Sequence, residues 1–449
     1  MTAFIVHPAR RALRGTITVP GDKSIGHRAL LFSCLSRTPV RVRGLGDGAD
    51  NGRSARAIAA LGARLERAGD EVIIHGTGLD GMQAPAAPID CGNSGTTIRL
   101  LCGLVAGQPF AVTLFGDESL SRRPMRRVID PLRQMGVVLA GQGDGADLVP
   151  PLTVGPSPRP LAAISYAQPV ASAQVKSAIL LAGLYADGVT TVIEPGPGRD
   201  HTERLLAHLG APLGFTPRGA GRAIHIGRAG WDRTLAADHI VVPGDPSSAA
   251  FLLIATLLVG GELALPGVST NPTRLGFVDA LRAMGATLEV TPAAEQGGEP
   301  VGQLGVAGAG PAPLRATRID GALTVRALDE LPILAVAAAR AEGETVIADA
   351  DELRVKESDR IATTVAMLRA FGVEAAATAD GLVVRGQPGR PLAAGRVDAA
   401  GDHRIAMAGA VAALCADAPS RIDDAGNVAT SYPGFIAALT ALGAEVEVV

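Results

Sequence analysis

A short phrase recurs six times along the chain, and it constrains the fold more than any other feature of the sequence. In each copy an apolar residue is followed three positions later by a second apolar residue and then by glycine. These glycines are spaced almost evenly: Gly62, Gly136, Gly210, Gly285, Gly372 and Gly443. Apolar residues three apart lie on one face of a helix, and glycine suits the left-handed position that ends a helix. The chain therefore consists of six similar supersecondary units.

Strand-like segments follow the glycines. Examples are residues 137–139, 288–290 and 382–385, which are rich in valine and leucine. A helix, a glycine stop and strands in each unit predict an α/β protein. One copy of this pattern would be weak evidence, because many α/β proteins contain it, but six copies at near-even spacing are specific.

A second repeat divides the chain into halves. The phrase VPGDKS at residues 19–24 returns as VPGDPS at residues 242–247, about three units later. Proline and glycine together mark turns. We therefore expect two domains of three units each. Residues 1–20 and 243–449 form domain 1, residues 21–242 form domain 2, and the hinge lies at residues 20–22 and 242–245.

Composition excludes several classes of protein. Hydrophobic residues make up 47% of the chain, charged residues 19%, and the net charge is −3, which argues against binding nucleic acid through bulk charge. The longest nearly apolar run, residues 249–261, is shorter than the roughly 20 residues of a membrane helix. The four cysteines form no CxxC motif, so neither a zinc site nor a disulfide framework is indicated. We read no signal peptide and expect a cytoplasmic protein.

Only three of the 41 basic residues are lysines, namely Lys23, Lys176 and Lys356. Where any cation would serve, this chain uses arginine. The three lysines are therefore candidates for positions that need a compact, titratable ammonium. The alternative is that neutral lysines survived by chance.

Candidate anion-binding residues occur in several phrases. PGDKSIGHR at residues 20–28 combines a glycine turn, a serine and cations at the expected start of a helix, where anions bind readily. GNSGTTIR at residues 92–99 lets backbone amides approach a ligand closely. Four arginines lie within residues 122–127. The alternatives are an ordinary tight turn and a solvated basic face.

Acidic candidates lie in the second half. Asp329 and Glu330 precede a very apolar stretch, which suits a general acid or base, although a helix N-terminus would show the same bias. LRVKESDR at residues 353–360 is the densest charged phrase. Lys356 and Arg360 are four apart, so on a helix they would share a face and would need an anion between them.

Eleven phrases in order resemble the motif series of 5-enolpyruvylshikimate-3-phosphate synthases, in the bacterial branch often called class II. They are PGDKSIGHR, GNSGTTIR, RRPM, SAQVKSA, RDHTE, VPGDPSS, NPTR, DELPILAVAAA, LRVKESDR, GDHRIAM and ATSYPGF. The resemblance implies the enolpyruvyl transferase fold, an inverse α/β barrel with six βαβαββ units, three per domain.

The resemblance also implies a reaction of the shikimate pathway, which leads to the aromatic amino acids. Phosphoenolpyruvate gives its enolpyruvyl group to the 5-hydroxyl of 3-phosphoshikimate and phosphate is released, by addition and elimination through a tetrahedral intermediate. It further implies a monomer that uses no metal or organic cofactor, no nucleic acid and no membrane.

Matching the motifs residue by residue implies a site. The residues expected to contact 3-phosphoshikimate are Lys23, Ser24, Arg28, Ser172, Ala173, Gln174, Arg199, Asp329 and Lys356. Those expected to contact phosphoenolpyruvate are Lys23, Gly95, Arg123, Gln174, Arg360 and Arg404. The catalytic residues would be Lys23, Asp329 and Glu357.

Two departures from the family pattern remove hydroxyl groups. Gly26 stands where the family usually has serine, and Gly198 where it often has serine or threonine. Gly95 leaves room for the herbicide glyphosate, whereas tolerant relatives carry alanine there. One alternative function is UDP-N-acetylglucosamine enolpyruvyl transfer, but that family carries a cysteine that residues 116–123 lack. The other is a non-catalytic paralogue, which we would expect to have lost charged residues that are present here.

Overall fold

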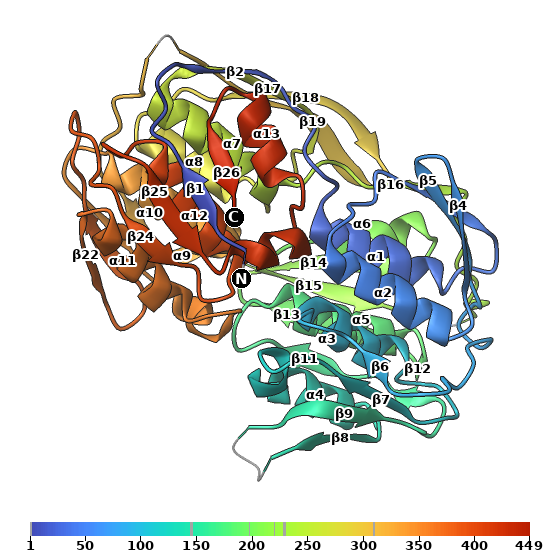
Figure 1. The fold of residues 1–449 in the computed structure, drawn as a ribbon. Helices are drawn as coiled ribbons and strands as arrows, with labels where there is room; N and C mark the ends of the chain where they lie inside the picture. The colour runs from blue at the N-terminus through green and yellow to red at the C-terminus, as the bar shows by residue number, and fades with distance from the viewer. Residues whose placement is uncertain (1, 144–146, 197, 220, 228–229, 309) are drawn as a thin grey trace. The chain divides into compact units, whose positions relative to one another are not determined.

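The computed structural model describes residues 2–143, 147–196, 198–219, 221–227, 230–308 and 310–449. The chain divides into two compact units (Figure 1). Unit 1 comprises Met1–Pro20, Pro243–Ala294 and Pro300–Val449, and unit 2 comprises Gly21–Val242 and Glu295–Glu299. The chain therefore passes between units after Pro20 and after Val242, and the tip of one hairpin of unit 1 groups with unit 2.

The described residues of unit 2 form three four-stranded sheets, a two-stranded sheet of β10 (Leu161–Ala162) and β12 (Ala186–Asp187), and six α-helices. The sheets, in spatial order, are β16 (His239–Val241), β3 (Val40–Arg43), β5 (Glu71–His75) and β4 (Arg64–Ala68); β6 (Ile89–Asp90), β7 (Val112–Phe115), β9 (Val149–Val154) and β8 (Leu139–Gln142); and β11 (Ser165–Ala167), β13 (Thr190–Glu194), β15 (Gly221–Ile226) and β14 (Leu213–Arg218). The helices are α1 (Lys23–Ser33), α2 (Ala49–Ala60), α3 (Gly95–Leu104), α4 (Arg126–Gln134), α5 (Ala173–Gly183) and α6 (His201–His208).

Unit 1 repeats this plan, with three four-stranded sheets and seven α-helices among its described residues. Its sheets are β18 (Glu289–Gln296), β19 (Glu299–Gly308), β17 (Gly261–Ser269) and β2 (Leu13–Thr16); β20 (Arg318–Ile319), β21 (Glu344–Ile347), β23 (Leu382–Arg385) and β22 (Glu374–Ala377); and β24 (Arg396–Asp398), β25 (Ser420–Asp423), β1 (Phe4–Val6) and β26 (Val446–Val448). Its helices are α7 (Pro246–Val259), α8 (Gly276–Ala283), α9 (Gly321–Ala327), α10 (Leu331–Ala339), α11 (Arg360–Ala370), α12 (His403–Ala413) and α13 (Phe435–Ala441).

Each of these six sheets contains one parallel pair of strands beside an antiparallel pair. Consecutive parallel strands are joined by a crossover connection, usually a helix, and four of the pairs have such a helix directly between them along the chain. The other two pairs, β2 with β17 and β16 with β3, use a strand from a remote part of the sequence. β1 also pairs with strands that are remote in the sequence: Figure 1 shows it between β25 and β26. The predicted fold of six repeated α/β units is confirmed.

In each unit three helices form the interior. They are α1, α3 and α5 in unit 2 and α7, α10 and α12 in unit 1. Every residue of α10 and α12 is buried, so both helices are enclosed on all sides. α10 is apolar throughout rather than on one stripe, whereas α12 carries His403 and Arg404 in its first turn. Gly103 shows how closely two of them approach, since a Cβ atom there would lie 2.2 Å from the carbonyl oxygen of Ala178 on α5. Because small aliphatic residues allow the helices to pack this closely, the cores are filled with few aromatic side chains.

The six repeat glycines take the predicted left-handed conformation. Their φ angles are 100° (Gly62), 87° (Gly136), 85° (Gly210), 90° (Gly285), 72° (Gly372) and 105° (Gly443). Each glycine follows the last turn of an outer helix and turns the chain into the next strand. These helices are α2, α4, α6, α8, α11 and α13. A non-glycine residue pays a steric penalty in this region.

Replacing Gly136 with alanine is therefore expected to lower the free energy of unfolding by about 1–2 kcal/mol through backbone strain alone. No atom lies within 4 Å of a Cβ at this position, so no side-chain clash contributes. Urea denaturation measures the change. Gly196→Ala is the matched control because its Cβ also meets open space and its φ is not positive. Equal stability of the two variants would contradict the conformational reason.

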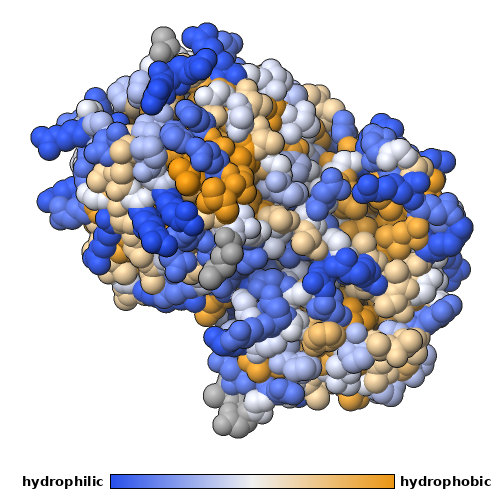
Figure 2. Space-filling view, viewed as in Figure 1, coloured by the Kyte–Doolittle hydropathy of each residue, from blue (hydrophilic) through white to orange (hydrophobic). Residues whose placement is uncertain are grey.

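The surface shown in Figure 2 is largely hydrophilic, with apolar side chains in separate areas. Among the helices that the structure describes, none combines the length and apolar character needed to cross a membrane.

Candidate active site

In unit 2 the motif residues collect at the N-termini of the three inner helices. Asp22 caps α1, Ser94 caps α3 and Ser172 caps α5, each by accepting a hydrogen bond from a backbone amide one turn later. The N-terminus of a helix carries a partial positive charge. These helix ends, together with the cations below, form an environment suited to anionic ligands.

Lys23 is the first residue of α1 and Ser24 the second. The Lys23 ammonium donates to Oδ2 of Asp50 on α2 at 3.0 Å, and about a fifth of its side chain is exposed. Ser24 is partly exposed beside it. The carboxylate thus holds the ammonium at the helix end while leaving it accessible.

Arg28 lies one turn deeper on α1 and is only 3% exposed. Its guanidinium donates to the hydroxyls of Thr202 (2.7 Å) and Ser177 (2.9 Å). Burial lowers the pKa of Arg28 to about 10, against the opposing effect of the Glu203 carboxylate. Arg28 still carries its charge at neutral pH. Arg199 is close enough to lower this pKa further, so the structure brings these two predicted site residues together.

A second group surrounds the start of α3. Gln174 on α5 accepts from Nη1 of Arg99 at 2.8 Å and donates to the Thr96 hydroxyl at 2.9 Å. A Cβ at Gly95 would lie 2.7 Å from Nη1 of Arg99 and 3.2 Å from Nη1 of Arg123. Gly95 therefore lies directly beside two guanidinium groups.

Arg123 has an unused donor. Its Nη2 donates to Oδ1 of Asn93 at 2.5 Å and to the Ser119 hydroxyl at 3.3 Å. Its Nε is buried and has no hydrogen-bond partner among the described residues. A buried unpaired donor on a cation suits an anion that accepts from it.

Lys176, a site candidate from the sequence, is the fourth residue of α5 and is neutralised inside the protein. Its ammonium is fully buried and contacts Oε1 of Glu194 (2.6 Å) and of Glu203 (2.7 Å). Arg222 donates to the same two carboxylates. Lys176 is the centre of a buried ion network. The same network accounts for Gly198, because a Cβ there would lie 2.7 Å from Oε1 of Glu194.

Replacing Lys176 with methionine is expected to lower the free energy of unfolding by about 3–5 kcal/mol, because it leaves two carboxylates buried with one cation fewer. Chemical denaturation measures the loss. Arg385→Met is the control: its pair with Glu374 is more than half exposed, so a loss below about 1 kcal/mol is expected. A loss for Lys176→Met as small as the control's would show that the network does not support the fold.

Unit 1 carries a cluster of three cations around one carboxylate. The cations lie within 4 Å of the Asp329 carboxylate: Arg360 Nη1 at 3.5 Å, Arg404 Nη2 at 3.8 Å and Lys356 Nζ at 3.9 Å. Asp329 lies in the turn before α10. The cations stabilise a negative charge there, and the apolar environment that the sequence predicted for this acid is present only on the α10 side.

Lys356 and Arg360 are not on one helix, so the shared helix face that their spacing would allow does not form. The Asp359 carboxylate accepts from the amides of Ile361 and Ala362 and starts α11 at Arg360, which leaves Lys356 in the preceding turn. The two cations nevertheless share an anion, namely Asp329.

Arg360 is almost completely buried and is held by acidic groups. Its Nε donates to Oδ2 of Asp402 at 2.8 Å and its Nη2 to Oε2 of Glu357 at 2.6 Å. Burial opposes the charge, but these carboxylates outweigh it and raise the pKa of Arg360. In the same way burial opposes ionisation of Asp402, whereas Arg360 holds the pKa of Asp402 below its usual value.

Arg404 follows Asp402, the N-cap of α12. Its Nη1 donates to the backbone oxygen of Asp329 at 2.7 Å, and its Nη2 lies 3.4 Å from the Ser247 hydroxyl. The predicted cations of unit 1 are thus close together. In unit 2, Arg28 and Arg199 are near each other, and Arg123 lies beside Gly95. Three supporting residues were not predicted: Asp50, Arg99 and Asp402. The last two lie inside the GNSGTTIR and GDHRIAM motifs, but nothing in the sequence singles out Asp50.

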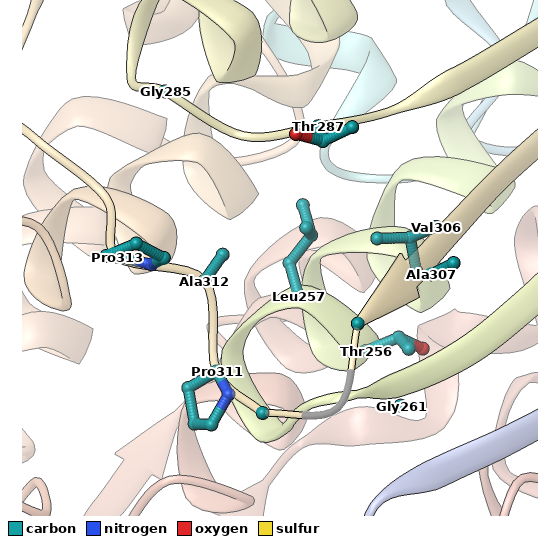
Figure 3. A pocket seen from close by; sticks show the side chains of 12 residues that line it. Thr256, Leu257, Gly261, Gly285, Thr287, Val306, Ala307, Pro311, Ala312 and Pro313 are labelled. Atoms are coloured by element: carbon teal, nitrogen blue, oxygen red, sulfur yellow. The ribbon is translucent and has the colours of Figure 1, made fainter.

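The surface has two further hollows, of which the second borders the Lys176 network through Glu203 and Arg222. One, of about 180 Å³ in unit 1, is lined by small and apolar residues, and Figure 3 shows Leu257 extending between Ala312 and Val306. The other, of about 410 Å³ in unit 2, is lined by residues of α6 and by Phe215 and Arg222. No group of three or more His, Cys, Asp or Glu side chains among the described residues could hold a metal ion.

Six repeated units with cations and carboxylates at the ends of their inner helices define an α/β enzyme for anionic substrates. The model of the EPSP synthase (3-phosphoshikimate 1-carboxyvinyltransferase) family matches residues 8–439. The chain belongs to this family.

Individual relatives agree over the full length. The 3-phosphoshikimate 1-carboxyvinyltransferase of Alkalilimnicola ehrlichii is 51% identical over 436 residues, covering 96% of this chain and 94% of the relative. That of Acidithiobacillus ferrooxidans is 48% identical over 455 residues, covering 100% and 99%. A solved EPSP synthase from Acinetobacter baumannii superposes with a TM-score of 0.86 at 39% identity, covering 100% of both chains.

Proposed function

We propose that this enzyme transfers the enolpyruvyl group of phosphoenolpyruvate to the 5-hydroxyl of 3-phosphoshikimate and releases phosphate. The observation that carries the proposal is the pair of cation clusters at the ends of inner helices in a chain that matches the family from residue 8 to residue 439. Both substrates carry several negative charges, and cations preorganised in a partly buried site stabilise such charges strongly.

The reaction needs two proton movements. In the addition step the 5-hydroxyl oxygen bonds to C2 of phosphoenolpyruvate, the hydroxyl loses its proton and the methylene carbon gains one. In the elimination step that carbon loses a proton and the C2–O bond to phosphate breaks. We assign these proton transfers to Lys23, Asp329 and Glu357, which are all partly exposed. Asp329 and Glu357 lie beside Arg360, and Lys23 is held by Asp50.

The remaining residues are assigned to substrate binding. The proposed ligands of 3-phosphoshikimate are Lys23, Ser24, Arg28, Ser172, Ala173, Gln174, Arg199, Asp329 and Lys356. Those of phosphoenolpyruvate are Lys23, Gly95, Arg123, Gln174, Arg360 and Arg404. The unpaired Nε of Arg123 supports its role. Arg360 is different, because Glu357 already accepts from its Nη2 at 2.6 Å. A substrate carboxylate must compete with Glu357 for this donor, and that competition would make Glu357 available for proton transfer.

Replacing Gly95 with alanine is expected to weaken inhibition by glyphosate more than it weakens binding of phosphoenolpyruvate. The added methyl group must displace the guanidinium ends of Arg99 and Arg123, which lie 2.7 and 3.2 Å from it. We expect the inhibition constant of glyphosate, competitive with phosphoenolpyruvate, to rise by about tenfold or more, the effect of losing about 1.4 kcal/mol. Steady-state kinetics with varied phosphoenolpyruvate measure it. Equal inhibition constants for wild type and variant would refute this expectation.

The sister activity with UDP-N-acetylglucosamine is not favoured, because similar full-length relatives, among them those of Alkalilimnicola ehrlichii and Acidithiobacillus ferrooxidans, carry the 3-phosphoshikimate name. A direct comparison of acceptors tests the choice. Product formation is measured with phosphoenolpyruvate and each acceptor separately, and turnover is expected only with 3-phosphoshikimate. Turnover with the sugar nucleotide alone would overturn the assignment, and no turnover with either would favour a non-catalytic paralogue. We further propose that the enzyme acts as a monomer in the cytoplasm, on small-molecule substrates only.

A further inference from the structure

The missing side chain at Gly26 is replaced by a side chain from another helix. A Cβ atom at Gly26 would lie 2.4 Å from Nδ2 of Asn51 and 3.1 Å from its Cγ. Carbon atoms in proteins do not approach so closely, because repulsion rises steeply inside van der Waals contact. The Asn51 carboxamide therefore occupies the space into which any side chain at position 26 would extend.

Asn51 is in an unusual environment for a polar residue. It is 2% exposed, and its Oδ1 is buried without a hydrogen-bond partner among the described residues. An unsatisfied buried acceptor costs about 1–3 kcal/mol. Packing alone does not explain an amide here, since an apolar side chain of similar size would avoid this cost.

The neighbours of Asn51 connect it to Lys23. Asp50, the preceding residue on α2, accepts from the Lys23 ammonium at 3.0 Å. On α1, residues three apart share a face, so Lys23 and Gly26 present the same side to α2. His27 lies one turn after Lys23 on α1, and its Nδ1 is 2.8 Å from the Ser54 hydroxyl of α2. Asn51 thus fills the space between the two hydrogen-bonded contacts that join these helices.

We infer that Asn51 is a positioning residue for the reaction. By filling the space beside Gly26, its carboxamide sets the separation of α1 and α2 and hence the place at which Asp50 holds the Lys23 ammonium. Gly26 and Asn51 form a matched pair, in which a small residue on α1 lies opposite a larger polar one on α2. The inference rests on the proposed function through the role assigned to Lys23.

Four proteins test this inference: wild type, Gly26→Ser, Asn51→Ala and the double variant. Gly26→Ser must push Asn51 aside and with it Asp50, and a displacement of about 1 Å can cost about 10²-fold in rate. We expect kcat to fall by about 10–10²-fold in Gly26→Ser, with a smaller fall in Asn51→Ala. In the double variant the serine occupies the vacated space, so kcat is expected to recover by about tenfold over Gly26→Ser, as coupled neighbours behave non-additively.

A matched control separates positioning from general destabilisation. Gly183→Ser adds the same side chain at the far end of inner helix α5, where a Cβ would lie 2.7 Å from Cγ2 of Ile226. This variant is expected to lower the melting temperature and leave the kcat of the folded protein unchanged. An equal loss of kcat in Gly183→Ser would overturn the positioning role of Asn51.

The double variant decides the pairing itself. A double variant no faster and no more stable than Gly26→Ser would overturn the inference. If Gly26→Ser does not fold, the double variant is decisive through folding alone: a folded double variant supports the pairing, and an unfolded one overturns it. If wild type forms no product, the proposed function fails. The coupling of positions 26 and 51 is then still measured by the melting temperatures of the four proteins.

Discussion

Replacing Lys23 with methionine is expected to lower kcat by about 10²–10⁴-fold, the usual cost of losing a group that transfers protons in the transition state. Methionine keeps most of the length of lysine and removes the ammonium that Asp50 holds at the end of α1. The melting temperature should fall less than that of Lys176→Met, because about a fifth of the Lys23 side chain is exposed whereas Lys176 is fully buried. Steady-state kinetics and thermal unfolding on one preparation provide both numbers.

Arg43→Met is the control for this variant. Arg43 also lies in unit 2, at the end of β3, and pairs with Glu71 at 2.7 Å, but its side chain is 59% exposed. Its kcat should match wild type. A Lys23→Met enzyme that keeps more than about a tenth of the wild-type rate would remove Lys23 from the list of proton-transfer groups, whose loss costs at least about 10²-fold.

Asp329→Asn is expected to separate kcat from KM. The rate should fall by about 10²–10⁴-fold, because an amide cannot take up or release the proton. Removing the negative charge leaves Lys356, Arg360 and Arg404 with one carboxylate fewer among them. These cations should then attract anions more strongly, so the KM for phosphoenolpyruvate should stay level or decrease.

Asp320→Asn serves as the comparison, since this acid pairs with Arg318 in a partly exposed position and should affect neither constant. A rise in the KM of Asp329→Asn with an unchanged kcat would mean that Asp329 binds substrate and does not move protons. That outcome would leave Glu357 and Lys23 as the remaining proton-transfer candidates.

The fold was predictable because its determinants are local in the sequence. Apolar residues three apart followed by glycine specify a helix and its end, and Gly62 and Gly443 take the left-handed conformation as predicted. The uniformly apolar helix α10 likewise follows from its own sequence. The repeated Pro-Gly phrase indicated that β2 and β16 each belong to a different half from the residues that follow them. Their partners, β17 for β2 and β3 for β16, depend on contacts remote along the chain.

The site was only partly predictable, because its hydrogen bonds join remote residues. Lys176 looked like a functional lysine, but Glu194 and Glu203, which neutralise it, lie 18 and 27 positions away. The spacing of Lys356 and Arg360 would place them on one face of a helix, but α11 begins only at Arg360, because the Asp359 side chain caps it. At position 26 the sequence showed a lost hydroxyl, and the structure adds that Asn51 occupies its space.

The central claim is that this chain is an enolpyruvyl transferase acting on 3-phosphoshikimate. The most direct measurement is phosphate release from the purified protein with phosphoenolpyruvate and 3-phosphoshikimate together and with each alone, using Lys23→Met as the blank for contaminating phosphatases. The account predicts rapid release only when both substrates are present and the enzyme is wild type, with one enolpyruvyl product formed for each phosphate. Release from either substrate alone at the same rate, or no release from the pair, would contradict it.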